Sequence, residues 1–306
     1  MSTDQAADAK EKLRNDALHY HRYPQPGKLE VVATKPLANQ RDLALAYSPG
    51  VAAACDAIVA DPLEAATVTG RGNLVAVVSN GTAVLGLGAI VVAAAVVNAL
   101  SLVRKKIDKV KLVSTGGGAA GIACLNQLLA LGLKRENVIL SDHKGVVFKG
   151  RTEDMTDQKA EYAADTKART LAEAIKDADV FLGLSAPGIL TGDMVKSMAK
   201  TPIILALANP EPEIRPEVAR EAAPDAIIAT GRSDYPNQVN NVLCFPFIFR
   251  AALDVGATDI NEEMKVACVN AVGDLTLAGQ LGRARRDRCA GARAPRDPMT
   301  PRHAFR

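Results

Sequence analysis

A glycine-rich loop near the middle of the chain has the spacing of a phosphate-binding turn. It fits the pattern GxGxxG. The first glycine of that pattern forms a tight turn, the second lets the backbone approach a pyrophosphate, and the third lets the following helix pack closely. The start of that helix offers free N–H groups and a partial positive charge to the phosphates. The residues that we predict to bind a dinucleotide here are Gly116, Gly117, Gly118, Ala119, Ala120 and Gly121.

Two residues at the end of the next predicted strand are candidates for contacts with the adenosine ribose of the dinucleotide. Asp142 ends that strand, twenty-one residues after Gly121, where an acidic residue binds the ribose hydroxyls. Lys144 follows two residues later, and a cation beside the ribose suits a 2′-phosphate. The aspartate favours NAD and the lysine favours NADP, so this pattern leaves the choice between the two cofactors open.

Further polar residues follow other predicted strands, and ligands of open α/β sheets bind beyond the carboxyl ends of the strands. Ser185 opens the segment SAPG. Asn209 closes a buried strand just before a proline, so its amide is predicted to face the ligand. Asn240 and Asn241 are predicted to begin an apolar helix, which one of them can cap. The tandem pair leaves the other asparagine for a second role.

Strands and helices alternate along the part of the chain that carries these residues. The strands are short, continuous apolar runs, as expected for a sheet that is covered on both faces. The predicted strands are 109–113, 136–142, 180–185, 202–210 and 225–231. The predicted helices are 116–132, 170–178, 189–200 and 216–223. This order predicts an α/β fold with a doubly wound parallel sheet, a Rossmann-like domain.

The residues before this part are harder to interpret. Four prolines between residues 24 and 49 exclude long helices there, and 28–33 and 73–79 have strand-like composition. The stretch 84–103 has twenty uncharged residues, the length of a membrane span. Glycine and alanine dominate it, and Asn98 and Ser101 lie inside it, so we predict a buried helix that begins near Ile90.

Composition places the chain among ordinary globular proteins, with 48% hydrophobic and 23% charged residues in a total of 306. Five cysteines without CxxC spacing are typical of a reduced, cytoplasmic compartment. The first residues have no apolar core, so no secretion signal is expected.

Residues 283–306 contain eight arginines and no lysine. We consider three interpretations, in this order: an out-of-frame translation of GC-rich DNA, a disordered end, and an arm that binds nucleic acid. Neither a nucleic-acid partner nor a membrane is our leading expectation for this chain.

Several blocks of the sequence together resemble malic enzyme of the bacterial NADP-dependent type. These blocks are 45–55, 72–88, 114–126, 142–151, 181–188, 206–214 and 229–257. The resemblance implies oxidation of L-malate by hydride transfer to NADP or NAD, and decarboxylation to pyruvate with Mg2+ or Mn2+. It also implies a homodimer or higher homo-oligomer.

The resemblance also implies roles for individual residues. Tyr47 matches the catalytic tyrosine that protonates the enolate. Asn209 and Asn241 match residues that hold the malate, and we place Asn240 with them as substrate-binding. The glycine loop and Asp142 match the cofactor site, to which we also assign Lys144, Ser185 and Asn209. The predicted cofactor-binding residues are Gly116, Gly117, Gly118, Ala119, Ala120, Gly121, Asp142, Lys144, Ser185 and Asn209.

The chain departs from the family pattern directly after Gly88. The block that carries the catalytic lysine and the metal-binding carboxylates in the family has no counterpart, and no lysine lies between Lys35 and Lys105. We therefore expect no metal-ligating residues and little or no malic activity. The expected domains are a truncated α/β catalytic domain of the malic enzyme type (1–88), an NAD(P)-binding domain (89–281) and an arginine-rich, disordered tail (282–306). The alternatives are a non-catalytic homologue that binds the dinucleotide or mediates oligomerisation, and a frameshifted or truncated gene product.

Overall fold

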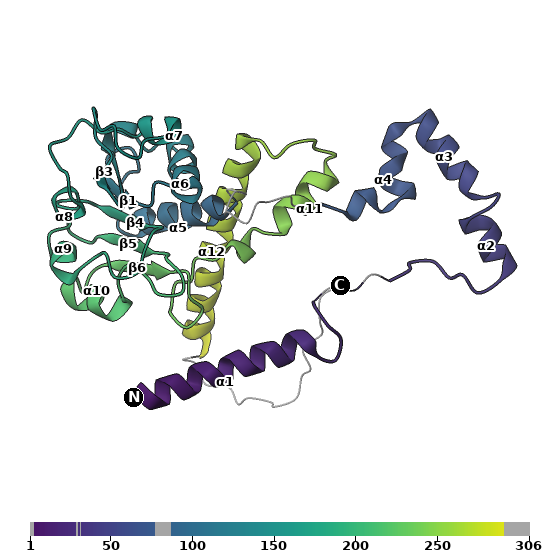
Figure 1. The fold of residues 1–306 in the computed structure, drawn as a ribbon, viewed down its shortest axis with the longest axis horizontal. Helices are drawn as coiled ribbons and strands as arrows, with labels where there is room; N and C mark the ends of the chain where they lie inside the picture. The colour runs from purple at the N-terminus through teal and green to yellow at the C-terminus, as the bar shows by residue number, and fades with distance from the viewer. Residues whose placement is uncertain (1–2, 29, 31, 77–86, 291–306) are drawn as a thin grey trace. The chain divides into compact units, whose positions relative to one another are not determined.

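The computed structural model describes residues 3–28, 30, 32–76 and 87–290 (Figure 1). It divides into two compact units, Met1–Arg71 and Gly72–Arg306. The first unit is helical in its described residues, and the second contains a six-stranded sheet.

The sheet of the second unit is parallel except at one edge. Its strand order is β3-β2-β1-β4-β5-β6, which matches the order 3-2-1-4-5-6 of the doubly wound dinucleotide fold. Only β3 is antiparallel, with Gly145 opposite Asp142. The strands are β1 (Leu112–Thr115), β2 (Val138–Asp142), β3 (Gly145–Val146), β4 (Val180–Gly183), β5 (Ile203–Ala206) and β6 (Ile227–Thr230).

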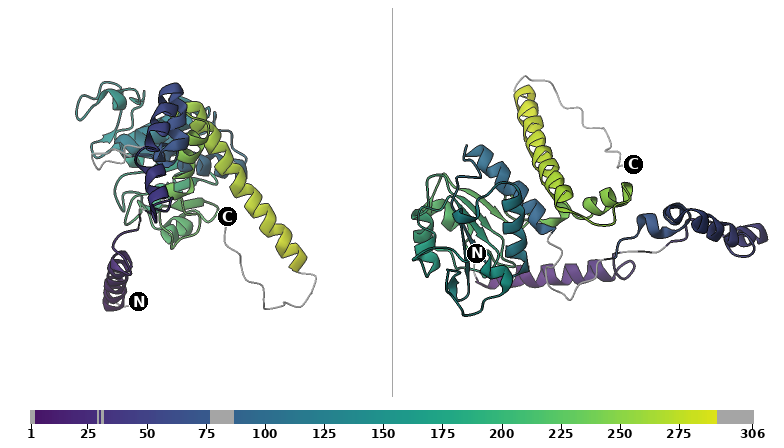
Figure 2. Two further views of the ribbon diagram at one scale, coloured as in Figure 1. Left: turned by 90° about the vertical axis from the view of Figure 1, so that its right-hand side faces the viewer. Right: turned by 90° about the horizontal axis from the view of Figure 1, so that it is seen from above.

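Both faces of the sheet are covered because both sets of alternating side chains are apolar. Leu112 and Leu182 pack into one hydrophobic cluster, which includes residues of the helices α5 and α6. Val113 and Phe181, their neighbours along the same strands, pack into a second cluster with residues of α8, α9 and α10. The doubly wound α/β fold that we predicted is therefore confirmed (Figures 1 and 2).

The helices of the second unit alternate with the strands. They are α5 (Gly88–Leu102), α6 (Ala119–Ala130), α7 (Asp157–Ala160), α8 (Leu171–Ala174), α9 (Gly192–Lys196), α10 (Pro216–Ala222), α11 (Phe247–Asp254) and α12 (Glu262–Ala290), with 3-10 turns η3 (Arg135–Asn137) and η4 (Asn241–Leu243). The 3-10 turn η2 (Gly70–Asn73) contains the last two residues of the first unit and the first two of the second. Threonine side chains cap α7, α8 and α9, and Pro216 starts α10.

The predicted order of five strands and four helices is confirmed, with two differences. The helices predicted over 170–178 and 189–200 are shorter in the structure. Only α8 and α9 are α-helical there, and loops form the rest of both connections between strands. Strand β3 was not predicted. It has only two residues and pairs with β2 after a tight turn, so it is too short to have a sequence period.

The uncharged stretch 84–103 contains α5, whose residues Ile90 to Leu100 are almost all buried. This confirms the buried helix, which begins at Gly88, two residues before the predicted start. It packs against α6 and, on another side, against the long helix α12 (Figures 1 and 2). Helix α12 continues to residue 290, so the boundary predicted at residue 281 falls inside a helix; residues 291–306 lie outside the described residues.

The first unit contains the helices α1 (Thr3–Arg22), α2 (Gln40–Ala46), α3 (Val51–Ala60) and α4 (Ala65–Val68) and the 3-10 turn η1 (Pro62–Glu64). The strands predicted over 28–33 and 73–79 are not found in the described residues of those segments. A strand is stable only when it is paired, and the described residues offer these segments no strand partner. The expectation of an α/β arrangement before the sheet is corrected to this extent.

One stretch of the first unit, Gln40–Ala60, is long and apolar enough to span a membrane by length and composition alone. It consists of α2 and α3, which are separated by a turn at residues 47–50. Neither helix has a buried residue. Helices in proteins gain most of their stability by packing an apolar face against other parts of the structure. The described residues supply no partner that buries the apolar side chains of α2 and α3.

Candidate functional site

Five parallel strands end at one edge of the sheet, and the loops that follow them open on the same side. Strands β2, β1, β4, β5 and β6 are paired in parallel. The glycine loop follows β1, Asp142 ends β2, Ser185 follows β4 and Asn209 follows β5. The structure thus places the predicted cofactor residues of the second unit at one edge, where dinucleotides bind in folds of this class.

Backbone contacts explain two of the three glycines of the GxGxxG pattern. Gly116 has φ +99°, and a Cβ there would lie 2.3 Å from the carbonyl oxygen of Leu184. A Cβ on Gly121 would lie 1.9 Å from the carbonyl oxygen of Gly116, so the start of the helix approaches the loop more closely than any side chain permits. A Cβ on Gly118 would meet no atom within 4 Å. Gly118 is therefore the glycine whose space is open to a ligand.

The start of α6 is free to bind an anion. Gly118 is the residue before the helix, and no side chain caps it. Ala119 and Ala120 form the first turn, which carries no acidic residue. The first N–H groups of a helix have no partner inside the helix, and a phosphate can accept their hydrogen bonds.

Asp142 is held by two cations. Its two carboxylate oxygens accept hydrogen bonds from Nη2 of Arg151 at 2.9 and 2.8 Å. Nζ of Lys159 lies 2.9 Å from Oδ2, and the backbone N–H of Lys144 donates to Oδ1 at 2.9 Å. Burial alone would raise the pKa of Asp142, but the hydrogen bonds from Arg151 and Lys159 lower it overall, so the carboxylate is ionised.

The side chain of Lys159 places a positive charge beside the glycine loop. Its Cε lies 2.8 Å from the position that a Cβ on Gly117 would occupy, and its side chain is 9% exposed. Nζ also pairs with Asp154 at 2.6 Å. Burial opposes the charge, but the hydrogen bonds to Asp154 and Asp142 raise the pKa of Lys159 overall, so the ammonium group stays charged.

Sequence reasoning missed Arg151 and Lys159. Arg151 lies in the loop after β3 and Lys159 lies within the short α7, and no motif spacing connects them with Asp142. The cation that we did predict, Lys144, is exposed and pairs with Glu153 at 2.6 Å. The structure thus shows three cations around the end of β2 where the sequence had indicated one.

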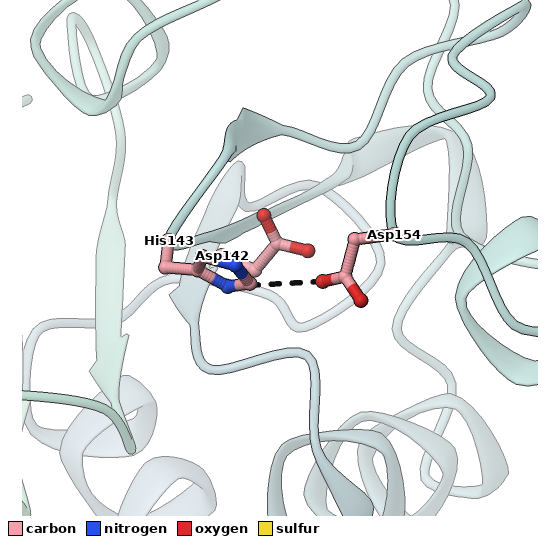
Figure 3. Close-up of side chains that lie close together, drawn as sticks. All are labelled: Asp142, His143 and Asp154. Atoms are coloured by element: carbon pink, nitrogen blue, oxygen red, sulfur yellow. Dashed lines mark ion pairs between the residues drawn. The ribbon is translucent and has the colours of Figure 1, made fainter.

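Asp142, His143 and Asp154 lie close enough together to be considered as a metal site. Their candidate ligand atoms are within 4.8 Å of one another, and Figure 3 shows the contact of 3.7 Å between His143 and Asp154. Both carboxylates, however, already accept hydrogen bonds from Lys159. A divalent cation needs several free oxygen ligands and would be repelled by the ammonium group, so this cluster does not fit Mg2+ or Mn2+.

The loops after β4 and β5 are joined by a buried carboxylate. The backbone N–H of Ser185 donates to Oε1 of Glu213 at 2.9 Å, and that of Ala208 donates to Oε2 at 3.0 Å. The hydroxyl of Ser185 donates to Oγ1 of Thr115 at 2.9 Å. Asn209, next to Ala208, is exposed and lies against Gly231 after β6. Sequence reasoning did not single out Glu213, although it belongs to the same block as Asn209.

Asn240 and Asn241 do not begin an apolar helix directly. Asn241 starts the 3-10 turn η4, and α11 begins at Phe247. The amide carbon of Asn241 lies 3.9 Å from the position that a Cβ on Gly88 would occupy. The correction has a local cause, since Pro246 lacks a backbone N–H and separates the turn from the helix.

Tyr47 belongs to the first unit, at the end of α2. Its side chain is 70% exposed. The other predicted site residues belong to the second unit, so the catalytic role of Tyr47 stays a prediction.

Comparison with known proteins agrees with this geometry. The family "Malic enzyme, NAD binding domain" matches residues 84–285. The chain is similar to an NADP-dependent malic enzyme of Haemophilus influenzae, with 49% identity over an alignment of 357 positions, gaps included, that covers 88% of this chain and 47% of the relative. It is also similar to an NAD-dependent malic enzyme of Rhizobium meliloti, with 47% identity, 89% of this chain and 46% of the relative.

The structure has the same fold as a crystal structure of malic enzyme from Pyrococcus horikoshii. The TM-score is 0.79 at 30% identity, covering 86% of this chain and 83% of the other. The chain spans about half the length of the first curated relatives that it matches.

The two kinds of glycine in the loop predict two different effects of alanine. Gly121→Ala places a Cβ against a carbonyl oxygen, so we expect a loss of about 3 kcal/mol or more in the free energy of unfolding. Gly118→Ala adds a methyl group to open space, so we expect an unchanged melting temperature and weaker dinucleotide binding. Thermal unfolding and fluorescence titration with NADPH separate the two effects; equal melting temperatures for both variants would contradict the assignment.

The ion pairs of Asp142 with Arg151 and Lys159 predict how the free energy of unfolding depends on pH. The pKa of Asp142 is lowered in the folded protein, so its contribution is complete above the unfolded value of about 3.9 and is lost as the pH falls through the lower folded value. The difference in urea midpoint between the wild type and Asp142→Asn should therefore be largest near neutral pH and shrink below about pH 4. A difference that stays constant from pH 7 to pH 3 would refute this.

Proposed function

Since this chain belongs to the malic enzyme family, we propose that it is an NADP-binding member with little or no malate-oxidising activity of its own. The observation that carries the cofactor assignment is the pair Arg151 and Lys159, which surrounds Asp142 beside the glycine loop. The weak activity is inferred from the missing catalytic block.

The charge pattern supports NADP over NAD. A ribose site for NAD uses a carboxylate with free oxygens, whereas both oxygens of Asp142 are occupied by Arg151 and Lys159. An arginine close to the ribose position can bind a 2′-phosphate with charge-assisted hydrogen bonds. The family includes both NADP- and NAD-dependent relatives, so the choice is argued from these side chains alone.

The residues of the sheet edge can hold the cofactor in the following way. The free N–H groups at the start of α6 bind the pyrophosphate, and Gly118 leaves room for its approach. Arg151 and Lys159 bind the 2′-phosphate. The loops with Ser185 and Asn209 line the next part of the edge, where we place the nicotinamide end and the substrate. When bound, the oxidised dinucleotide supplies the hydride acceptor for the hydroxyl-bearing carbon of malate.

The alignment with the relatives supports the loss of an internal block. The match to the Haemophilus influenzae protein extends over 357 positions, but 88% of 306 residues is only about 270. Many positions of the relative therefore have no counterpart inside the aligned part of this chain. We place the loss after Gly88, where the chain departs from the family pattern.

The remaining residues do not replace the lost chemistry. No lysine lies between Lys35 and Lys105 to serve as the partner base of Tyr47. Among the described residues, the one cluster of acidic and histidine side chains close enough for a metal ion is already paired with Lys159. We therefore derive no metal-assisted step for this chain.

A second candidate function is a non-catalytic subunit that pairs with another copy or an intact homologue. It is favoured by the helices α2 and α3, which are apolar and have no buried residues. Association in the family's homodimeric manner would cover such a surface.

Activity and binding should separate in the purified chain. We expect NADPH to bind, and NADPH formation from malate and NADP in the presence of Mn2+ to be at the level of a no-enzyme blank. The assay follows absorbance of NADPH, with an intact relative as the positive control. Turnover comparable to that relative would overturn the proposed loss of activity, and absence of NADPH binding would overturn the proposed function as a whole.

The cofactor preference depends on Arg151. Arg151→Ala should weaken NADPH binding about 10- to 100-fold, because charge-assisted hydrogen bonds contribute about 1.5–3 kcal/mol. NADH binding should stay equal or become tighter, since Asp142 regains a free oxygen. Lys149→Ala is the matched control, because that exposed lysine pairs with Asp165 instead. Equal weakening of both cofactors in fluorescence titrations would contradict the assignment.

A further inference from the structure

Glu213 is a carboxylate in an unusual environment for a charged group. Its side chain is 0% exposed. Among the described residues no lysine, arginine or histidine forms an ion pair with it; its partners are backbone N–H groups. Burial raises the pKa of Glu213, and the hydrogen bonds from Ser185 and Ala208 oppose that rise. An unpaired acid in the interior is unfavourable, so its position calls for a structural reason.

The two oxygens of this carboxylate connect two different loops. Oε1 accepts from Ser185, which follows β4, and Oε2 accepts from Ala208, which follows β5. Gly183, the last residue of β4, leaves the space for it, because a Cβ there would lie 2.4 Å from the carboxyl carbon. Two backbone hydrogen bonds between the same loops, Gly188 N–H to Pro212 and Leu190 N–H to Glu213, support the same arrangement.

The connection continues to the glycine loop. Ser185, held by Glu213, donates its hydroxyl hydrogen bond to Thr115, the last residue of β1. The next residue is Gly116, which packs against the carbonyl group of Leu184. The carboxylate of Glu213 thus joins the loops after β4 and β5, and the hydroxyl of Ser185 joins them to the end of β1, where the glycine loop begins.

We infer that Glu213 is a positioning residue that holds the loops of Ser185 and Asn209 at the spacing that the dinucleotide requires. This inference rests on the proposed cofactor site. Glu213 itself does not touch the reacting atoms. It acts through Ser185 and Ala208, and the neighbour of Ala208 is Asn209.

The test compares the full chain with Glu213→Gln and with Glu211→Gln. Glutamine preserves the size of residue 213 but replaces one acceptor oxygen by an amide group that faces a backbone N–H. Glu211→Gln makes the same change two residues away, at a partly exposed side chain that pairs with Arg215 and Arg232. The readouts are the Kd of NADPH and amide hydrogen exchange measured by mass spectrometry, with and without NADPH.

For Glu213→Gln we expect NADPH to bind about tenfold more weakly. We also expect faster exchange at residues 184–188 and 207–212, with unchanged exchange in α5 and α6. A general loss of stability would instead increase exchange throughout the sheet and its helices, and that outcome would overturn the inference. Glu211→Gln should match the wild type in both readouts.

Gly183→Ala provides an independent variant, because its new Cβ displaces the carboxyl group without changing its chemistry. It should reproduce the exchange pattern of Glu213→Gln, and the double variant should add little to either. If the wild type binds NADPH and Glu213→Gln binds it equally well, the inference is wrong while the proposed function stands. If the wild type does not bind NADPH, the proposed function fails, and this inference fails with it.

Discussion

Strand β1 is hydrogen-bonded in parallel on both sides, and the rest of the second unit depends on this pairing. Leu112 is opposite Val138 of β2 on one side and Val180 of β4 on the other. Parallel neighbours require crossover connections, so helices must cover both faces, and the carboxyl ends must gather at one edge. The glycine loop can therefore meet Asp142 from β2 and Leu184 after β4 only because β1 lies between those two strands. The same topology lets a single carboxylate, Glu213, reach the loops after β4 and β5.

The charged side chains at this edge surround the carboxylate of Asp142, whose two oxygens are already paired. Asp142 is held by Arg151 and Lys159, and Lys159 is shared with Asp154. The positive and negative charges of this cluster therefore compensate one another, and the side chain of Lys159 lies beside Gly117 of the glycine loop.

The two units differ in how far the residues of their apolar helices are buried. In the second unit α5 is buried between the sheet, α6 and α12, and a charge-free sequence is the natural composition for such a helix. In the first unit α2 and α3 are also apolar, yet none of their residues is buried. Gly88, the first residue of α5, lies next to Asn241, whose amide carbon is 3.9 Å from the position of a Cβ on Gly88. The proposed loss of a block from the first domain would explain both the exposed helices and the absence of the family's catalytic groups.

The sequence by itself determined the sheet, the glycine loop and the order of strands and helices, because apolar runs and glycine spacing are local properties that reflect local geometry. It also identified the family, through blocks distributed over most of the chain. It could not determine the partners of Asp142 or the role of Glu213, because Arg151, Lys159 and Ser185 reach these carboxylates across loops and neighbouring strands, without a fixed spacing. It also predicted strands before residue 80 that the described residues do not form, since a strand requires a pairing partner and not only a suitable composition. Only the tertiary structure decided which cations surround Asp142 and which carboxylate joins the loops, because hydrogen bonds and ion pairs of this kind depend on distances that packing alone sets.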